Sequence, residues 1–153
     1  MNLSFREASI EDVALLRAFE SQLINYERAL EPTLIQTGHL EYYDIPKLIT
    51  DQNARIIIVE VDNKPVGCGL GQIKENDACY NEKKYGYIGL MYVMPDQRGK
   101  NIGGLVMQQL VNWFKERNIS EVRLKVYAKN SIAIQSYEKF GFEHYIQEMK
   151  LKR

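Results

Sequence analysis

The stretch that decides the fold reads Leu90-Met91-Tyr92-Val93-Met94-Pro95-Asp96-Gln97-Arg98-Gly99-Lys100-Asn101-Ile102-Gly103-Gly104-Leu105. Its apolar first part is typical of a β-strand, Pro95 ends that strand, and a helical pattern begins near Ile102. The loop between them is basic and rich in glycine. A helix N-terminus offers unpaired N–H groups and about half a positive charge, and glycines let an anion approach the backbone closely. The loop therefore predicts a phosphate cradle.

The glycine spacing does not distinguish such a cradle from an ordinary strand-to-helix connection, which explains the spacing equally well. The P-loop motif requires a lysine and a hydroxyl residue after its last glycine, and here Gly104 is followed by Leu105 and Val106. The dinucleotide fingerprint G-x-G-x-x-G is also absent, because Gly99, Gly103 and Gly104 do not have its spacing. A second motif is needed to distinguish a phosphate cradle from an ordinary connection.

Length and composition predict a single domain over residues 1–153, with 45% hydrophobic residues to form its core. No run approaches the roughly 18 apolar residues of a membrane span, and the N-terminus lacks the apolar stretch of a signal peptide. We therefore expect a cytoplasmic protein with no membrane partner. Two cysteines and two histidines predict no disulfide framework and no metal site, and Cys68 is expected to be a small buried hydrophobe.

Charge is unevenly distributed although the formal net charge is zero. Residues 1–97 contain nine Lys and Arg against fifteen Asp and Glu, and residues 98–153 contain eleven against five. This asymmetry favours an anionic ligand for the second part and a cationic one for the first, although solvated surface charge explains most of these residues. There is no long basic block, so nucleic acid is not an expected partner.

Hydrophobic periodicity predicts an α+β fold in the order β, helices, βββ, α, β, α, β, with a parallel crossover around the glycine-rich loop. Gly86 and Gly89 lie inside a predicted strand, where glycine often marks a bulge or a close approach. The expected strands are 3–7, 55–61, 66–73, 85–94, 122–127 and 142–149. The expected helices are 10–25, one between 20 and 44, a short one capped at Asp44, 102–118 and 131–141.

Two motifs together indicate a family. Val93-Met94-Pro95 is followed by Arg98-Gly99-Lys100-Asn101-Ile102-Gly103, which is similar to an R-x-x-G-x-G loop after a V-x-P strand end. The second is N-x-x-A-x-x-x-Y-x-x-x-G-F, which is matched by Asn130, Ala133, Tyr137, Gly141 and Phe142. With a predicted strand between them, the chain resembles the GNAT superfamily of acyl-CoA-dependent N-acyltransferases over nearly its whole length, least so from residue 27 to 53.

The resemblance implies a mixed, mostly antiparallel sheet flanked by helices, with a splayed strand pair at the coenzyme A site. It implies direct transfer of an acetyl group from acetyl-CoA to a primary amine of a small molecule or peptide, within a ternary complex. Tyr137 would protonate the departing thiolate, and no covalent enzyme intermediate is needed. The residues implied in cofactor binding are Met91, Tyr92, Val93, Arg98, Gly99, Lys100, Asn101, Ile102, Gly103, Gly104, Asn130 and Tyr137.

The chain departs from the family pattern at two positions. Asn101 replaces the usual first glycine of the loop, and asparagine tolerates left-handed backbone geometry, so we expect phosphate binding to be retained. Tyr87 stands where many members have a glutamate base. The base is then a water molecule or a carboxylate such as Glu27 or Glu31, or the amine arrives neutral.

The acceptor is indicated only by an acidic, tyrosine-rich window from Glu20 to Asp44, which favours a cationic amine but is explained as well by a solvated helix face. The candidate substrate-binding residues are Tyr26, Glu27, Glu31 and Tyr87. Two alternatives to the enzyme stay open, a non-catalytic acyl-CoA-binding module and a nucleotide-binding domain unrelated to coenzyme A. A homodimer is also left open, because an exposed C-terminal strand could pair with its copy in a second chain.

Overall fold

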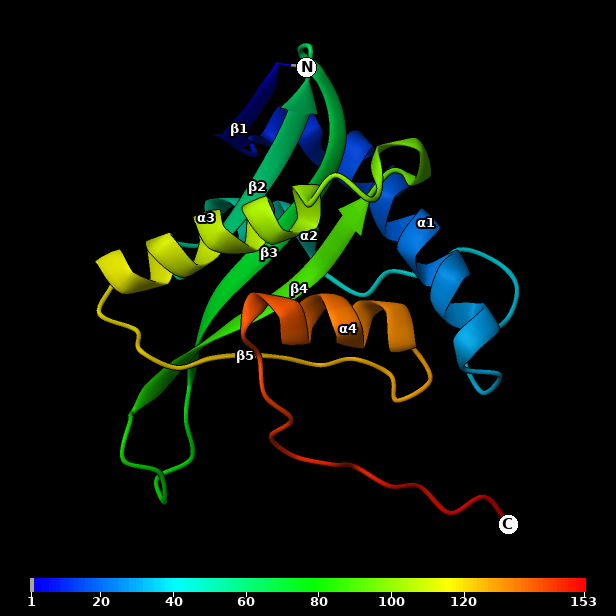
Figure 1. The fold of residues 1–153 in the computed structure, drawn as a ribbon, viewed down its shortest axis with the longest axis vertical. Helices are drawn as coiled ribbons and strands as arrows, with labels where there is room; N and C mark the ends of the chain where they lie inside the picture. The colour runs from blue at the N-terminus through cyan, green and yellow to red at the C-terminus, as the bar shows by residue number, and fades with distance from the viewer. Residues whose placement is uncertain (1) are drawn as a thin grey trace.

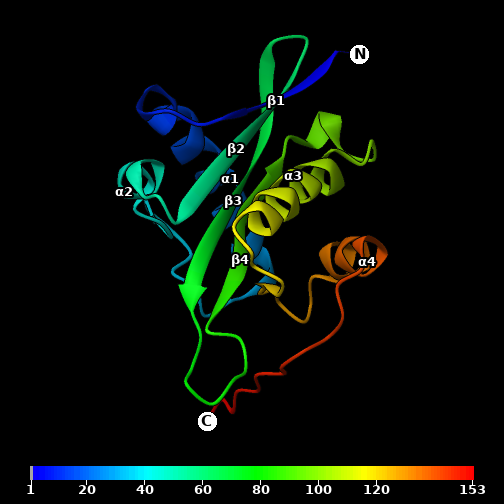
Figure 2. The same cartoon turned by 90° about the vertical axis from the view of Figure 1, so that its left-hand side faces the viewer.

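The computed structural model describes residues 2–153 as a five-stranded sheet with helices on both faces (Figures 1 and 2). The strands are β1 Leu3–Glu7, β2 Ala54–Val61, β3 Lys64–Glu75, β4 Lys84–Val93 and β5 Val122–Leu124. The helices are α1 Val13–Leu30, α2 Ile45–Thr50, α3 Ile102–Glu116 and α4 Ser131–Phe140, with single turns η1 Ile10–Asp12 and η2 Pro95–Gln97. The strands follow chain order, and only β4 and β5 pair in parallel. The predicted α+β class is confirmed.

Two hydrophobic clusters hold the layers together. Residues of α1 and α2, such as Leu16 and Leu48, pack against one face of the sheet, and residues of α3 and α4, such as Phe114 and Phe140, pack against the other. Figure 2 shows α3 and α4 on the same side of the sheet. Helix α3 lies close to the strands because glycines face it. A Cβ at Gly86 would stand 2.8 Å from the Phe114 ring. None of the helices in residues 2–153 has the length and apolar character needed to cross a bilayer.

A bulge in β4 reverses the direction of its side chains beside Gly89. Leu70 of β3 pairs with Gly89 and Cys68 pairs with Tyr92, so two residues of β4 stand opposite one residue of β3. Leu90 in the bulge has φ of 49°, in the left-handed region. Ile88 before the bulge packs with the α3 cluster, whereas Leu90 packs with the α1 cluster. The position agrees with the bulge that a glycine inside a strand indicates.

The parallel pair β4 and β5 separates soon after it forms. Gly86 to Ile88 pair with Val122 to Leu124, and no further pairs follow. From Gly89 onward β4 has no strand partner on this side within the described residues. The predicted splayed strand pair is therefore confirmed, and it leaves backbone groups of β4 open next to the glycine-rich loop.

The helix predicted between residues 20 and 44 is wrong. Helix α1 continues to Leu30, and residues 31–44 form no helix or strand. Side chains satisfy the backbone of this segment instead: Arg28 donates to the carbonyl oxygens of Ile35 at 2.8 Å and Gly38 at 2.7 Å. These hydrogen bonds connect the irregular segment to the end of α1. The short helix after Asp44 is confirmed as α2, with Asp44 accepting from the Lys47 N–H at 3.3 Å.

The strand predicted over residues 142–149 is also wrong, and β5 ends at Leu124 rather than near residue 127. Residues 142–153 run away from the sheet without regular structure, as the red segment in Figure 1 shows. Ile146 is 70% exposed and Met149 is 85% exposed. Since β5 is only three residues long, it offers few backbone groups with which this segment could pair.

We expect Asp12→Ala to lower the free energy of unfolding by about 1 kcal/mol at pH 7. Asp12 accepts from the Ser9 N–H at 2.8 Å and pairs with Arg6 at 2.8 Å. The Arg6 hydrogen bond lowers the pKa of Asp12 to about 2. The carboxylate therefore contributes fully above its unfolded pKa of 3.8, and the contribution is lost as the pH falls toward 2. The Arg6 side chain is 39% exposed, so solvent screening keeps the effect small.

Urea unfolding of wild type and Asp12→Ala at pH 7, 4 and 3 measures this contribution, with Glu11→Ala as the matched acidic control. The difference should shrink between pH 4 and 3. An equal difference at all three pH values would mean that the Asp12 charge contributes nothing.

Candidate active site

The loop after β4 ends in a row of backbone N–H groups that make no hydrogen bond within residues 2–153. Gly99 has φ of 81° and Asn101 has φ of 60°, so both lie in the left-handed region, as expected for asparagine at this position. The first helical bond of α3 runs from the Leu105 N–H to the Asn101 carbonyl at 3.1 Å. The N–H groups of residues 99–104 find no acceptor within residues 2–153. Orphan donors at a helix N-terminus form an anion site.

The basic side chains of the loop are used to hold it together. Arg98 donates from Nε to the Val93 carbonyl at 2.9 Å, and its guanidinium lies over the Tyr92 ring. Lys100 Nζ donates to Gln97 at 3.0 Å. Arg98 thus fixes the loop to the end of β4, and an anion would be met chiefly by backbone N–H groups.

Helix α4 carries the second motif beside the opening between β4 and β5. Asn130 caps this helix by accepting from the Ala133 N–H at 3.3 Å, and Gly141 ends it with φ of 128°. Tyr137 is partly buried, and its ring meets that of Phe142 edge to face at 6.1 Å. Burial, followed by the charge of Glu27 and the nearby Tyr87, raises the pKa of Tyr137 to about 12. Its hydroxyl therefore stays protonated at neutral pH and can donate.

Two of the predicted acceptor residues approach Tyr137 from the other side of the opening. Burial raises the pKa of the Glu27 carboxyl on α1, whereas a hydrogen bond from the Tyr42 hydroxyl lowers it. Tyr87 of β4 and Tyr43 meet over Gly89, where an added Cβ would collide with the Tyr43 hydroxyl. The charge of Glu27 raises the pKa values of both Tyr87 and Tyr137, as does burial, the larger cause. Glu27, Tyr87 and Tyr137 are thus electrostatically coupled although they belong to three separate elements.

The other two predicted acceptor residues are placed differently. Tyr26 is 41% exposed on the surface of α1. Glu31 accepts from the Thr33 N–H at 2.9 Å and pairs with Lys150 at 3.0 Å. The structure does not bring either of them into contact with Tyr137.

Three further tyrosines join this region that were not among the predicted acceptor residues, although two of them lie in the predicted tyrosine-rich window. Tyr42 and Tyr43 are held there because Glu20, which is fully buried, accepts from their N–H groups at 3.0 and 3.1 Å. The charge of Glu27 also raises the pKa of Tyr127, second to burial. Tyr127 lies between β5 and the asparagine of the second motif, and that position was the only available signal for it.

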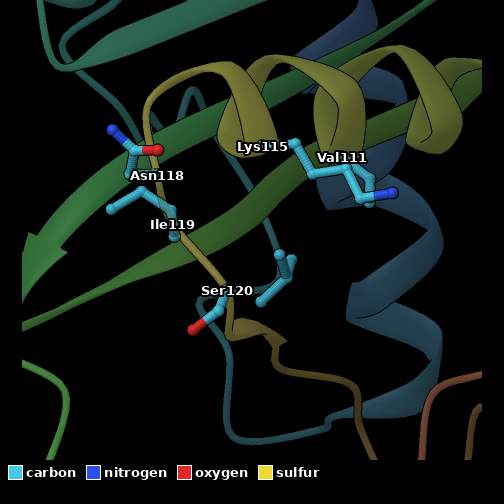
Figure 3. A pocket seen from close by; sticks show the side chains of 6 residues that line it. Val111, Lys115, Asn118, Ile119 and Ser120 are labelled. Carbon is cyan, nitrogen blue, oxygen red and sulfur yellow. The ribbon is translucent and has the colours of Figure 1, made fainter.

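A separate hollow lies at the opposite end of α3 from the loop. Figure 3 shows Val111 and Lys115 on the last turns of the helix, and Asn118, Ile119 and Ser120 on the segment that follows it. None of the predicted site residues lines it, and Lys115 is its one charged side chain.

The comparisons with known proteins agree with the fold. A curated relative, N-alpha-acetyltransferase 30 of Saccharomyces cerevisiae, is 24% identical over 129 residues, which cover 80% of this chain and 70% of the relative. A predicted acetyltransferase of Clostridium acetobutylicum, solved with acetyl-CoA, has a TM-score of 0.74 at 24% identity and covers 99% of this chain and 96% of its own. A Bacillus halodurans protein, solved as a tetramutant, has a TM-score of 0.87 at 18% identity, and the match covers 98% of this chain and 99% of that protein. Residues 7–142 match the profile of the Acetyltransferase (GNAT) family, and the chain therefore belongs to this family.

Proposed function

We propose that the protein is an N-acetyltransferase that moves an acetyl group from acetyl-CoA to a primary amine by direct transfer in a ternary complex. The observation that carries the proposal is the row of unpartnered N–H groups at residues 99–104, which follows the open edge of β4. A diphosphate suits the loop, and a chain of amides suits the strand edge. Acetyl-CoA combines both features with an activated thioester.

The chain's own residues divide the binding task. The N–H groups from Gly99 to Gly104 hold the diphosphate, and Arg98 keeps this loop at the end of β4. Val93 directs its N–H toward the splayed side, because the Met94 N–H donates to the Val66 carbonyl of β3 at 2.8 Å and neighbouring residues alternate. The Val93 carbonyl already accepts from Arg98. The amide of Asn130 has a donor side that is not needed for capping, and it faces the cofactor in the proposal.

In this proposal the thioester end of acetyl-CoA lies beside the bulge of β4. Backbone N–H near Met91 polarises the thioester carbonyl, and Tyr137 gives its proton to the leaving sulfur. Cys68 does not act as a nucleophile, since it is buried and burial raises the pKa of its thiol far above the ordinary value. The protein works by holding donor and acceptor together.

We expect acetyl-CoA to release its thiol only when a primary amine is present. The measurement is thiol release with a panel containing small monoamines, a polyamine, an amino sugar, and peptides with a free N-terminal or lysine amine. A peptide α-amine belongs in the panel because the yeast relative is named for that activity. Peptides with an acetylated N-terminus and no lysine serve as the control.

The panel also tests the alternative of a non-catalytic acyl-CoA-binding module. That alternative predicts that coenzyme A raises the midpoint of thermal unfolding but that no amine causes thiol release. Thermal stabilisation by ATP and not by coenzyme A would contradict both the acetyltransferase and the acyl-CoA-binding module.

A further inference from the structure

Glu27 differs from the other carboxylates around it because no cation neutralises it. Glu20 pairs with Arg17 at 2.9 Å, Glu41 pairs with Arg17 at 3.2 Å, and Glu31 pairs with Lys150 at 3.0 Å. Within residues 2–153, no Lys, Arg or His side chain forms an ion pair with Glu27. Its hydrogen bond comes from a neutral group, the Tyr42 hydroxyl. A half-buried carboxylate without a cation is costly unless a ligand supplies one.

The nearest basic residue on the same helix is held elsewhere. Arg28 donates from Nε to the Ile35 carbonyl at 2.8 Å, from Nη1 to Asn25 at 3.0 Å and from Nη2 to the Gly38 carbonyl at 2.7 Å. Lys74 of β3 lies over the ring of Tyr87 at 4.3 Å, and it too makes no ion pair with Glu27. The charge of Glu27 is therefore left for an incoming group.

The charge of Glu27 acts on tyrosine side chains from several elements. We call these side chains the tyrosine cluster, and they are Tyr42 and Tyr43 before α2, Tyr87 on β4, Tyr127 after β5 and Tyr137 on α4. The rings of Tyr42 and Tyr43 meet edge to face at 6.4 Å. Tyr42 is 37% exposed and Glu27 is only partly buried, so a solute can reach them. Electron-rich ring faces around one carboxylate suit an ammonium group.

We propose that Glu27 and the tyrosine cluster bind the ammonium head of the acceptor and that Glu27 removes the proton which the nitrogen must lose before it attacks. The inference rests on the proposed function for the direction from which the acceptor arrives. It names the acceptor class as a primary ammonium on an uncharged stem, because a single unpaired carboxylate can balance a single positive charge. A nearby carboxylate on the acceptor would be repelled by Glu27.

The proton transfers balance in this scheme. The nitrogen gives one proton to Glu27, and then forms the C–N bond as the C–S bond breaks. Tyr137 gives its proton to the sulfur and recovers one from the nitrogen, and Glu27 releases its proton to solvent. Burial already raises the pKa of Glu27, which makes it a stronger base than an exposed glutamate. Once protonated, Glu27 no longer raises the pKa of Tyr137, so Tyr137 donates more easily.

The first experiment measures binding without any acetyl donor. Butylamine and butyltrimethylammonium are titrated calorimetrically at pH 7 into wild type, Glu27→Gln and Glu41→Gln. Both cations should bind wild type and Glu41→Gln, and Glu27→Gln should lose about tenfold in affinity. Glu41 is the matched control because it adjoins Tyr42 but is paired with Arg17 and His39. Thermal unfolding of each variant verifies that it is folded.

The second experiment compares the pH dependence of kcat/KM for butylamine. Wild type should lose rate only as Glu27 becomes protonated at low pH. The charged groups that act on the tyrosine cluster beside Glu27 are Arg28, Lys74, Glu20 and Glu31, and none of them forms an ion pair with Glu27. In Glu27→Gln the rate should instead rise about tenfold per pH unit toward the amine pKa, because only amine that is already neutral reacts.

The two experiments separate the inference from the function on which it rests. If thiol is released but Glu27→Gln binds and reacts like Glu41→Gln, the inference is overturned and the acetyltransferase stands. If no amine causes thiol release while Glu27 still governs binding of butyltrimethylammonium, the ammonium site stands and the proposed function fails. Equal binding of both cations to all three proteins would also overturn the inference.

Discussion

Replacing Tyr137 by phenylalanine is expected to lower kcat about 100-fold while KM for acetyl-CoA changes little. The substitution keeps the ring that packs against Phe142 at 6.1 Å and removes only the hydroxyl. Without that proton donor, the sulfur must leave as a thiolate in a partly buried site, where its charge is poorly solvated. Because the hydroxyl is needed only as the C–S bond breaks, the loss belongs in kcat. Steady-state thiol release with a saturating amine measures it.

The matched control is Tyr85→Phe. Tyr85 stacks on Arg123, whose guanidinium carbon lies 3.9 Å from the ring centroid, and the substitution keeps that ring. This variant should retain wild-type kcat. Equal kcat values for Tyr137→Phe and wild type at every pH would remove Tyr137 from the proposed mechanism.

The pH dependence of the wild type gives an independent test of the same residue. Burial and the charge of Glu27 raise the pKa of Tyr137 to about 12, so the proton-donating form persists to higher pH than in a free phenol. The rate should therefore show no decline from tyrosine ionisation up to about pH 10. An early decline that disappears in Tyr137→Phe would mean that the hydroxyl ionises at an ordinary pKa.

Local sequence patterns predicted the conformation of the glycine-rich loop and the end of α4, because these features are local. The left-handed conformation of Asn101 and the end of α4 at Gly141 each depend on the residue at that position and a few neighbours. Tyr137 lies in the same motif as Asn130 and Gly141, and a single helix carries it. Periodicity and motif spacing describe such features well.

The acceptor side could not be predicted in the same way, because contacts between distant residues determine it. Glu20 orders residues 42 and 43 by accepting from their N–H groups, and Arg28 holds Gly38 from ten positions away. The same window resembles a helix in composition, so propensity alone gave the wrong prediction. Glu27 differs from Glu20, which pairs with Arg17, and from Glu31, which pairs with Lys150. This difference is seen only once those ion pairs are known. The lack of a cation at Glu27 is not visible in the sequence.

The largest expected effect on cofactor binding comes from Gly104→Ala, which should weaken coenzyme A binding about 30-fold. A Cβ at Gly104 would collide with the Asn101 side-chain oxygen, so that side chain must move. Both groups lie at the start of α3, where the N–H groups of residues 99–104 are unpartnered. Losing one hydrogen bond to a charged phosphate costs about 2 kcal/mol, which corresponds to the stated factor. Calorimetric titration of coenzyme A measures the change, and alanine should not weaken the helix itself.

The double variant Asn101→Gly with Gly104→Ala identifies the cause. Glycine also adopts the left-handed conformation that Asn101 has at φ of 60°, and it lacks the side-chain atoms that meet the new Cβ. If the displaced Asn101 amide covers the N–H groups, the double variant should regain most of the lost affinity. If it does not, the alanine methyl itself keeps the phosphate away. If Gly104→Ala alone leaves the affinity for coenzyme A unchanged, a cradle at residues 99–104 is contradicted. The collision with the Asn101 side chain at the start of α3 would then have no effect on binding.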